Sequence, residues 1–119
     1  MSPFLLPLVS LVLQISVICH QPGQEWEATK VHLQLPVATV AFYRSSDGSV
    51  HLGPWACKNV ATPSGAWVLA HELGHRWQQQ QGLPYDEKQA DKIGDRDWRA
   101  VYKKICSVRT CVANVKLGG

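Results

Sequence analysis

The sequence lacks three features that would assign a chain of this length to a common class. Its formal net charge is only +3 over 119 residues, which is too small to predict a nucleic-acid partner. None of its four cysteines belongs to a CxxC pair, so a metal site built from cysteines is not expected. Internal repeats are absent, and the one low-complexity tract, Gln78 to Gln81, is interpreted as the exposed end of a helix. With 45% apolar and 18% charged residues, the composition predicts one globular domain.

Basic residues are missing before Lys30. Residues 4–19, FLLPLVSLVLQISVIC, are uncharged and mostly apolar, and their length suits a signal-peptide core better than the roughly 20 residues of a membrane span. We therefore predict a hydrophobic leader at residues 1–19, either cleaved as a signal peptide or kept as a membrane anchor, and a single domain at residues 20–119. A buried first helix or strand is the alternative. The leader predicts a secreted or membrane-associated protein, and the missing basic residues leave a cytoplasmic protein as the alternative.

The cysteine pairing depends on that leader. If Cys19 is removed with it, three cysteines remain, and at most one internal disulfide can form. Cys106 with Cys111 is the favoured pair, and Cys57 competes for either of them. In a cytoplasmic protein all of these thiols would stay reduced.

Acidic residues are missing after Asp97, whereas five basic residues follow it: Arg99, Lys103, Lys104, Arg109 and Lys116. We interpret them as a solvated basic face. The alternative is a patch that attracts an acidic partner or a membrane surface.

Two strands and two helices are expected after the leader. Residues 37–43 and 49–53 are strand candidates, and the Asp47-Gly48 turn between them predicts a β-hairpin. Thr62 can cap a helix that starts at Pro63, and Gly82 and Pro84 end it. A second helix is predicted over residues 86–105. The short turn implies that the two helices pack side by side, roughly antiparallel.

The first helix carries a pattern suited to metal chemistry. His71 and His75 are four residues apart, so both side chains project from the same face. Two imidazoles so placed can bind one zinc ion, with Glu72 in reach of a water molecule on that ion. Zinc lowers the pKa of its water toward 7, and Glu72 is the obvious group to take the proton. The alternative is a pair of exposed histidines on a surface helix.

A third ligand is expected from the second helix. Gln78 and Gln81 stand where the metzincin pattern requires Gly and His, so that class is excluded. Glu87 and Asp91 are again four residues apart and share one helix face. Glu87 is the expected ligand, and Asp91 would accept a hydrogen bond from a ligand histidine and fix its tautomer. The alternative for each acid is a solvated side chain.

The motifs HELGH and DEKQADKIG, within residues 66–94, resemble those of the gluzincin metallopeptidases, of which thermolysin is the familiar member. The family pattern is HExxH, a spacer, and Glu-x-x-x-Asp, often followed by Gly. The resemblance implies that His71, His75 and Glu87 bind zinc, that Glu72 is the general base, and that Asp91 bonds the first histidine. It implies an α+β, minimal zincin-like fold, in which an N-terminal β-hairpin or small sheet precedes the HExxH helix and an antiparallel helix that carries the third ligand.

Small bacterial HExxH peptidases of the ImmA/IrrE type are also similar, and they place a sheet-edge strand before this helix to pair with an extended substrate. Ser49–Gly53 is the expected counterpart. Only 11 residues separate His75 from Glu87, which predicts a shallow cleft. Candidates for stabilising the oxyanion are, in order, Tyr85, His51 and Tyr102, each of which has a packed, non-catalytic role as its alternative.

The sequence thus predicts a monomeric peptidase that uses one zinc ion per chain to cleave an extended peptide or protein, with a possible membrane tether and no nucleic-acid partner. One alternative is a metal-stabilised regulatory or binding module with little hydrolytic activity. Another is a membrane-tethered or secreted interaction domain whose basic tail is the functional surface and whose metal only stabilises the fold.

Overall fold

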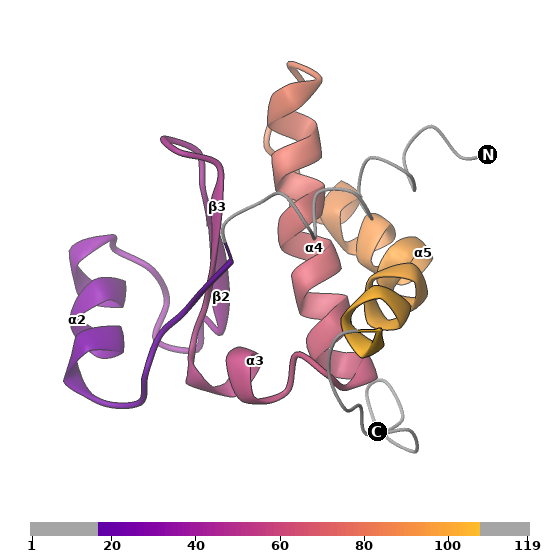
Figure 1. The fold of residues 1–119 in the computed structure, drawn as a ribbon. Coiled ribbons are helices and arrows are strands. Elements are labelled where there is room, and N and C mark those ends of the chain that lie inside the picture. The colour runs from indigo at the N-terminus through magenta and orange to yellow at the C-terminus, as the bar shows by residue number, and fades with distance from the viewer. Residues whose placement is uncertain (1–16, 108–119) are drawn as a thin grey trace.

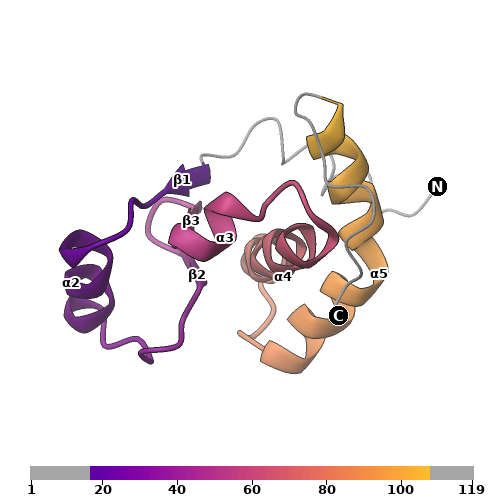
Figure 2. The ribbon, with the colours of Figure 1, turned by 90° about the horizontal axis from the view of Figure 1, so that it is seen from below.

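The computed structural model describes residues 17–107, which form the predicted α+β fold (Figure 1). The elements in chain order are β1 (Val17–Cys19), α2 (Gln24–His32), β2 (Ala41–Arg44), β3 (Ser49–Leu52), α3 (Pro54–Lys58), α4 (Pro63–Gln80) and α5 (Glu87–Cys106). Helix α4 lies between the sheet and α5, and α2 lies beyond the opposite face of the sheet (Figure 2). The described residues therefore stack as α2, sheet, α4 and α5.

The sheet has three strands in the order β1-β3-β2. Strands β2 and β3 form the predicted antiparallel hairpin, and Gly48 in its turn adopts φ +71°, a conformation that glycine tolerates. The expectation that Ser49–Gly53 is the edge strand is wrong, because β1 pairs in parallel with the other side of β3. Among the described residues, β1 and β2 form the two edges of the sheet, and β2 is shorter than predicted.

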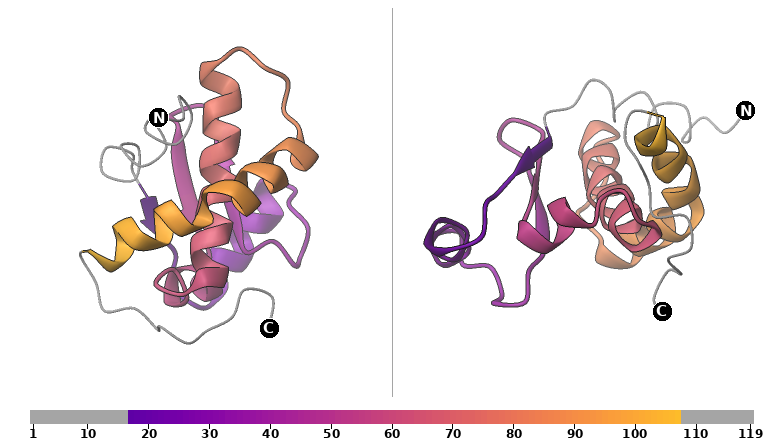
Figure 3. Two further views of the ribbon diagram at one scale, coloured as in Figure 1. Left: turned by 90° about the vertical axis from the view of Figure 1, so that its right-hand side faces the viewer. Right: turned by 60° about the horizontal axis from the view of Figure 1, so that its bottom comes forward.

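The helix boundaries follow the capping residues. The Thr62 side chain accepts a hydrogen bond from Gly65 N at 3.2 Å at the start of α4, and Asp86 accepts one from Gln89 N at 3.1 Å at the start of α5. Gly82 reverses the chain between them with φ +69°. Helix α5 turns back across α4 obliquely (Figure 3, left).

Two glycines permit this close crossing. A Cβ atom on Gly74 would lie 3.2 Å from Ile93, and one on Gly94 would lie 2.8 Å from the Trp67 ring. On the other side of α4, Leu69 and Leu73 pack in the core that also contains Val50 and Leu52 of β3. The core thus fixes α4 relative to both the sheet and α5.

Helix α2 is held mainly by two residues. Trp26 is buried and stacks with Phe42 of β2 at a centroid distance of 6.1 Å. Lys30 donates a 2.6 Å hydrogen bond to the carbonyl oxygen of Val37 and so fastens the segment between α2 and β2. That segment is thereby kept beside the open edge of β2.

The cysteine prediction is wrong for Cys57, which forms a disulfide with Cys19 and ties β1 to α3. Cys106 is also disulfide-bonded, and its predicted partner Cys111 lies outside the described residues. Most of the predicted leader lies outside them too. Its last three residues form β1, so cleavage after Cys19 would remove this strand and the disulfide. Within residues 17–107, none of the helices combines the length and apolarity needed to cross a membrane.

Candidate metal centre

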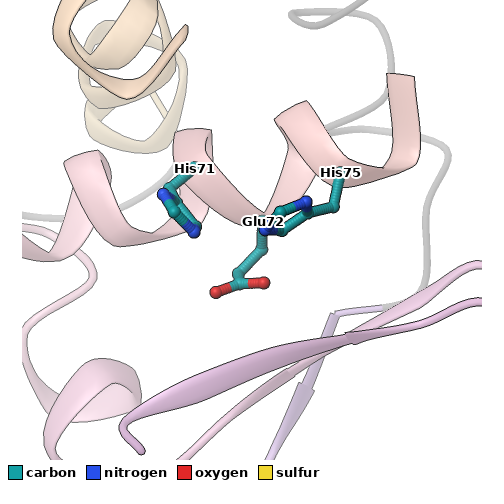
Figure 4. A group of neighbouring side chains, drawn as sticks. All are labelled: His71, Glu72 and His75. Carbon is teal, nitrogen blue, oxygen red and sulfur yellow. The ribbon is translucent and has the colours of Figure 1, made fainter. Parts of the chain in front are cut away.

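Three neighbouring side chains in the middle of α4 can converge on one ion. His71, Glu72 and His75 are buried; Glu72 points from α4 toward the sheet, and the rings of His71 and His75 lie beside it (Figure 4). Each offers one nitrogen or oxygen atom, and these three atoms lie within 4.8 Å of one another. The one-turn spacing of the histidines produces this convergence, with their rings edge to face at 4.9 Å. The group could hold a metal ion.

Glu87, the first residue of α5, brings a second carboxylate to the histidines. Its Oε1 lies 3.4 Å from Nε2 of His71 and 2.5 Å from Nε2 of His75. Ligands on a tetrahedral ion with bonds of 2.0–2.1 Å are separated by about 3.4 Å. The first distance matches this value, and the second requires Glu87 to move back by about 1 Å. The structure therefore places the predicted third ligand against both imidazoles.

The contact between Nε2 of His75 and Glu87 favours a cation at this position. Nε2 of His75 is buried and makes no hydrogen bond of regular geometry, although the Glu87 oxygen is close to it. A buried imidazole nitrogen and a carboxylate oxygen that face the same small space repel each other unless a proton or a metal ion lies there. The arrangement of these side chains thus fits a metal ion.

Asp91 lies one turn after Glu87 on α5, beside His71. Its Oδ1 is 2.9 Å from Nδ1 of His71, although the contact is not aligned as a regular hydrogen bond. Burial and the neighbouring His75 lower the pKa of His71, and the carboxylates of Glu87 and Asp91 oppose that shift. The structure therefore brings Asp91 to the first histidine, where the sequence predicts it.

The electrostatics of the two glutamates differ. Burial, followed by the negative charge of Glu87, raises the pKa of Glu72 to about 8, while the backbone of Tyr43 partly offsets this by hydrogen bonding. Burial also acts to raise the pKa of Glu87, but the Tyr85 hydroxyl and the two histidines outweigh it and lower that pKa. Glu87 is thus the more readily ionised carboxylate, which suits a ligand.

Of the three residues predicted to stabilise the oxyanion, only Tyr85 lies beside the histidines of the candidate metal centre. Its ring stacks on His75 at 4.0 Å, and its hydroxyl bonds to Glu87; burial and this bond raise the pKa of Tyr85. His51 points to the other face of the sheet, because side chains alternate along β3 and both of its neighbours, Val50 and Leu52, pack in the core. There His51 contacts His20 at 2.8 Å and Ser49 at 2.9 Å.

Tyr102 is also far from the group. It follows Asp91 by 11 residues on α5, which corresponds to about 16 Å along the helix axis. Its ring packs near Trp98 at 6.2 Å. The structure therefore brings neither Tyr102 nor His51 to the candidate metal centre.

A cleft follows the open edge of β2 next to the histidines. A cavity of about 420 Å³ contains His71, Glu72 and Glu87 in its wall, and residues from the α2–β2 segment, among them Leu33 and Pro36, form the opposite side. Because Val40 and Arg44 direct their carbonyl groups toward β3, the backbone groups of Ala41 and Tyr43 face this cleft. An extended chain could pair with that edge.

Sequence reasoning missed Gln78, whose side chain is only 1% exposed. The interpretation of Gln78–Gln81 as an exposed helix end is therefore wrong for this residue. The available signal was its spacing, since a residue three positions after His75 lies on the same helix face. Gln79 was missed as well: it accepts a hydrogen bond from the Tyr43 hydroxyl and donates one to the carbonyl oxygen of Ser45 at 3.1 Å. These bonds hold the hairpin against α4.

Comparison of the chain with protein-family models, with curated proteins and with solved structures gives no match. The chemical interpretation therefore depends on the side chains themselves. The two imidazoles and the exposed carboxylate of Glu87 meet beside a cleft and can bind a cation, and the buried carboxylate of Glu72 lies in the same group of side chains.

Proposed function

We propose that the protein is a zinc-dependent peptidase with a minimal zincin-like fold. The observation that carries this proposal is the position of Glu87, whose carboxylate comes from a different helix and still lies against Nε2 of both His71 and His75. A carboxylate oxygen against two buried imidazole nitrogens is favourable when a positive charge lies between them, and a metal ion supplies that charge. Two histidines and one glutamate, with a fourth position open, form a ligand set found in catalytic zinc sites.

The two glutamates have separate roles. Glu87 approaches both histidines and serves as the ligand, whereas Glu72 lies between them and β2, with the backbone of Tyr43 as its partner. When bound, zinc supplies a polarised carbonyl group and a water of lowered pKa. Glu72 would accept a proton from the attacking water and pass it to the leaving nitrogen of the substrate, because the positive charge of a bound ion favours the ionised form of Glu72 that burial disfavours. Tyr85 is placed to donate a hydrogen bond to the oxygen of the attacked carbonyl.

The substrate is an extended peptide or protein segment that lies along β2. The outward-facing backbone groups of Ala41 and the carbonyl group of Tyr43 supply hydrogen bonds for such a strand, and these bonds do not depend on its side chains. The cleft beside them gives room for side chains near the cleaved bond. The ligands, the base and the edge strand that the proposal requires all lie in one chain, so a monomer suffices for the proposed activity.

The Cys19–Cys57 disulfide supports a location outside the cytoplasm, either secreted or attached to a membrane, because such bonds persist in oxidising compartments.

Two glutamine substitutions and a control test the proposal. Glu72→Gln should retain one zinc ion per chain and lose peptide hydrolysis, because the ligands remain and the base is lost. Glu87→Gln should lose zinc as well. Glu25→Gln, at an exposed acid on α2, should change neither. Zinc is measured by mass spectrometry after dialysis, and hydrolysis with a fluorogenic casein substrate.

The outcomes separate the alternatives. Full hydrolysis by Glu72→Gln would refute a peptidase mechanism that uses this base. Zinc binding without hydrolysis in the wild-type protein would favour the metal-stabilised binding module. Unchanged zinc content in Glu87→Gln would refute the ligand assignment.

A further inference from the structure

Gln78 is a fully buried amide between α4 and the start of α5. Burying an amide is unfavourable unless its polar atoms are hydrogen-bonded. The Gln78 oxygen lies 3.0 Å from Nδ1 of His75 and accepts a bond from Asp86 N at 3.3 Å. Its nitrogen donates to the carbonyl oxygen of Asp86 at 2.9 Å and to the side chain of Gln89 at 2.8 Å. Both ends of the amide therefore have partners.

The backbone of Asp86 determines which end of the amide faces His75. A carbonyl oxygen only accepts, so the Gln78 nitrogen must face Asp86 O. A backbone N–H only donates, so the Gln78 oxygen must face Asp86 N. The same oxygen faces Nδ1 of His75, and an amide oxygen cannot donate a proton. The His75 proton must therefore be on Nδ1.

A proton on Nδ1 leaves Nε2 of neutral His75 as an electron-pair donor. Nε2 is the atom that faces Glu87 and makes no regular hydrogen bond. We propose that Gln78 is the positioning residue of the metal centre: it holds His75 in the tautomer that binds metal through Nε2. This inference rests on the proposed zinc site and adds a residue that lies outside the HELGH motif of this chain.

The same amide links His75 to the other helix. Asp86 immediately precedes Glu87, so the two bonds from Gln78 to the Asp86 backbone fix the point from which Glu87 approaches the histidines. One side chain therefore orients one ligand and anchors the segment that delivers another. Metal affinity should depend on Gln78 even though it does not touch the ion.

The direct test reads the tautomer of His75 in metal-free protein. Two-bond ¹⁵N–¹H correlation spectra, recorded in mildly alkaline buffer, distinguish a proton on Nδ1 from one on Nε2. The wild-type protein should show Nδ1–H. Gln78→Met, which keeps the approximate size but removes the amide, should shift His75 toward Nε2–H, and Gln80→Met, at an exposed position of the same glutamine run, should not.

Zinc affinity, measured by competition with a chromophoric chelator, gives a second readout. Gln78→Met should weaken binding by about 10- to 100-fold, and Gln80→Met should leave it unchanged. Gln78→Glu keeps an acceptor for His75 while losing the donor to Asp86, so it should restore the Nδ1–H tautomer. If Gln78→Met does not fold, the tautomer of His75 in the Gln78→Glu variant tests the proposal.

An Nε2–H tautomer in the wild-type protein, or loss of Nδ1–H in a folded Gln78→Glu variant, would overturn the proposal. Wild-type zinc affinity in Gln78→Met would do the same. These results are distinct from a failure of the proposed function, since the tautomer is read without metal or substrate. A protein that orients His75 as expected but hydrolyses nothing would refute the peptidase and leave the role of Gln78 intact.

Discussion

Because Asp91 contacts His71, removing the charge of Asp91 should weaken zinc binding. Asp91 lies 2.9 Å from the nitrogen of His71 that faces away from Glu87, and its side chain is 56% exposed. Asp91→Asn keeps the shape of the side chain and removes its charge. Because Asp91 is half exposed, this substitution should leave the fold of the metal-free protein unchanged.

The effect should appear in zinc binding. Loss of a carboxylate partner behind a ligand histidine typically lowers metal affinity by 10- to 100-fold, or about 1.4 to 2.8 kcal/mol. At a fixed excess of zinc, each tenfold loss of affinity lowers the zinc-dependent gain in unfolding free energy by about 1.4 kcal/mol. For a domain of this size, that corresponds to a zinc-dependent rise in Tm that is smaller by roughly 6 to 11 °C.

Asp95→Asn is a matched control one turn further along α5. Asp95 likewise contacts an aromatic ring of α4: it accepts a hydrogen bond from Nε1 of Trp67 at 2.8 Å, but this ring is not a proposed ligand. Calorimetry with and without zinc should show a reduced zinc-dependent rise in Tm for Asp91→Asn alone. Equal rises in the wild type and both variants would show that Asp91 does not support a ligand.

Three further predictions concern other parts of the molecule. Replacing both Cys19 and Cys57 with alanine should lower the free energy of unfolding by about 4 kcal/mol in urea titrations, from the chain entropy of a 38-residue separation, and a change below about 1 kcal/mol would contradict this. Burial lowers the pKa of His51 from 6.5, so the unfolded state binds the proton more readily and stability should fall as the pH drops below about 6.5. The pH dependence of urea midpoints should be weaker in His51→Gln, and equal slopes would refute this source. Tyr85→Phe should retain zinc and lower kcat by about 100-fold, whereas Tyr102→Phe should have wild-type kcat; the reverse order would reassign the oxyanion donor.

The sequence predicted the helix boundaries and the hairpin, because these features depend on residues that are close together in the chain. Thr62, Asp86 and Gly82 mark the helix boundaries through capping and a left-handed turn, each of which depends on a few neighbouring residues. The hairpin follows in the same way from Asp47-Gly48. The side-by-side placement of His71 and His75 needs only the pitch of a helix.

The failures concern partners that are distant in sequence. Val17–Cys19 was assigned to an apolar leader, because nothing local reveals that it pairs with β3, some 30 residues later. The resemblance predicted an edge position for Ser49–Gly53, which the pairing of β1 with β3 rules out, and the partner of Cys57 is Cys19 and not Cys106 or Cys111. Gln78 was judged by its polar neighbours, whereas its burial depends on the return of α5.

The candidate metal centre and the cleft depend on different parts of the fold. The positions of His71, His75 and Glu87 are determined by the contact between α4 and α5, where Gly74 allows Ile93 to approach and Gln78 fastens the turn. The substrate-pairing edge of the cleft depends instead on β2, which Gln79 and the buried core hold against α4. Substitutions at the helix crossing should therefore change metal affinity, whereas substitutions along β2 should change substrate binding and leave the metal in place. A Tyr43→Phe variant with lowered zinc affinity but unchanged KM would show that the two functions are not separable in this way.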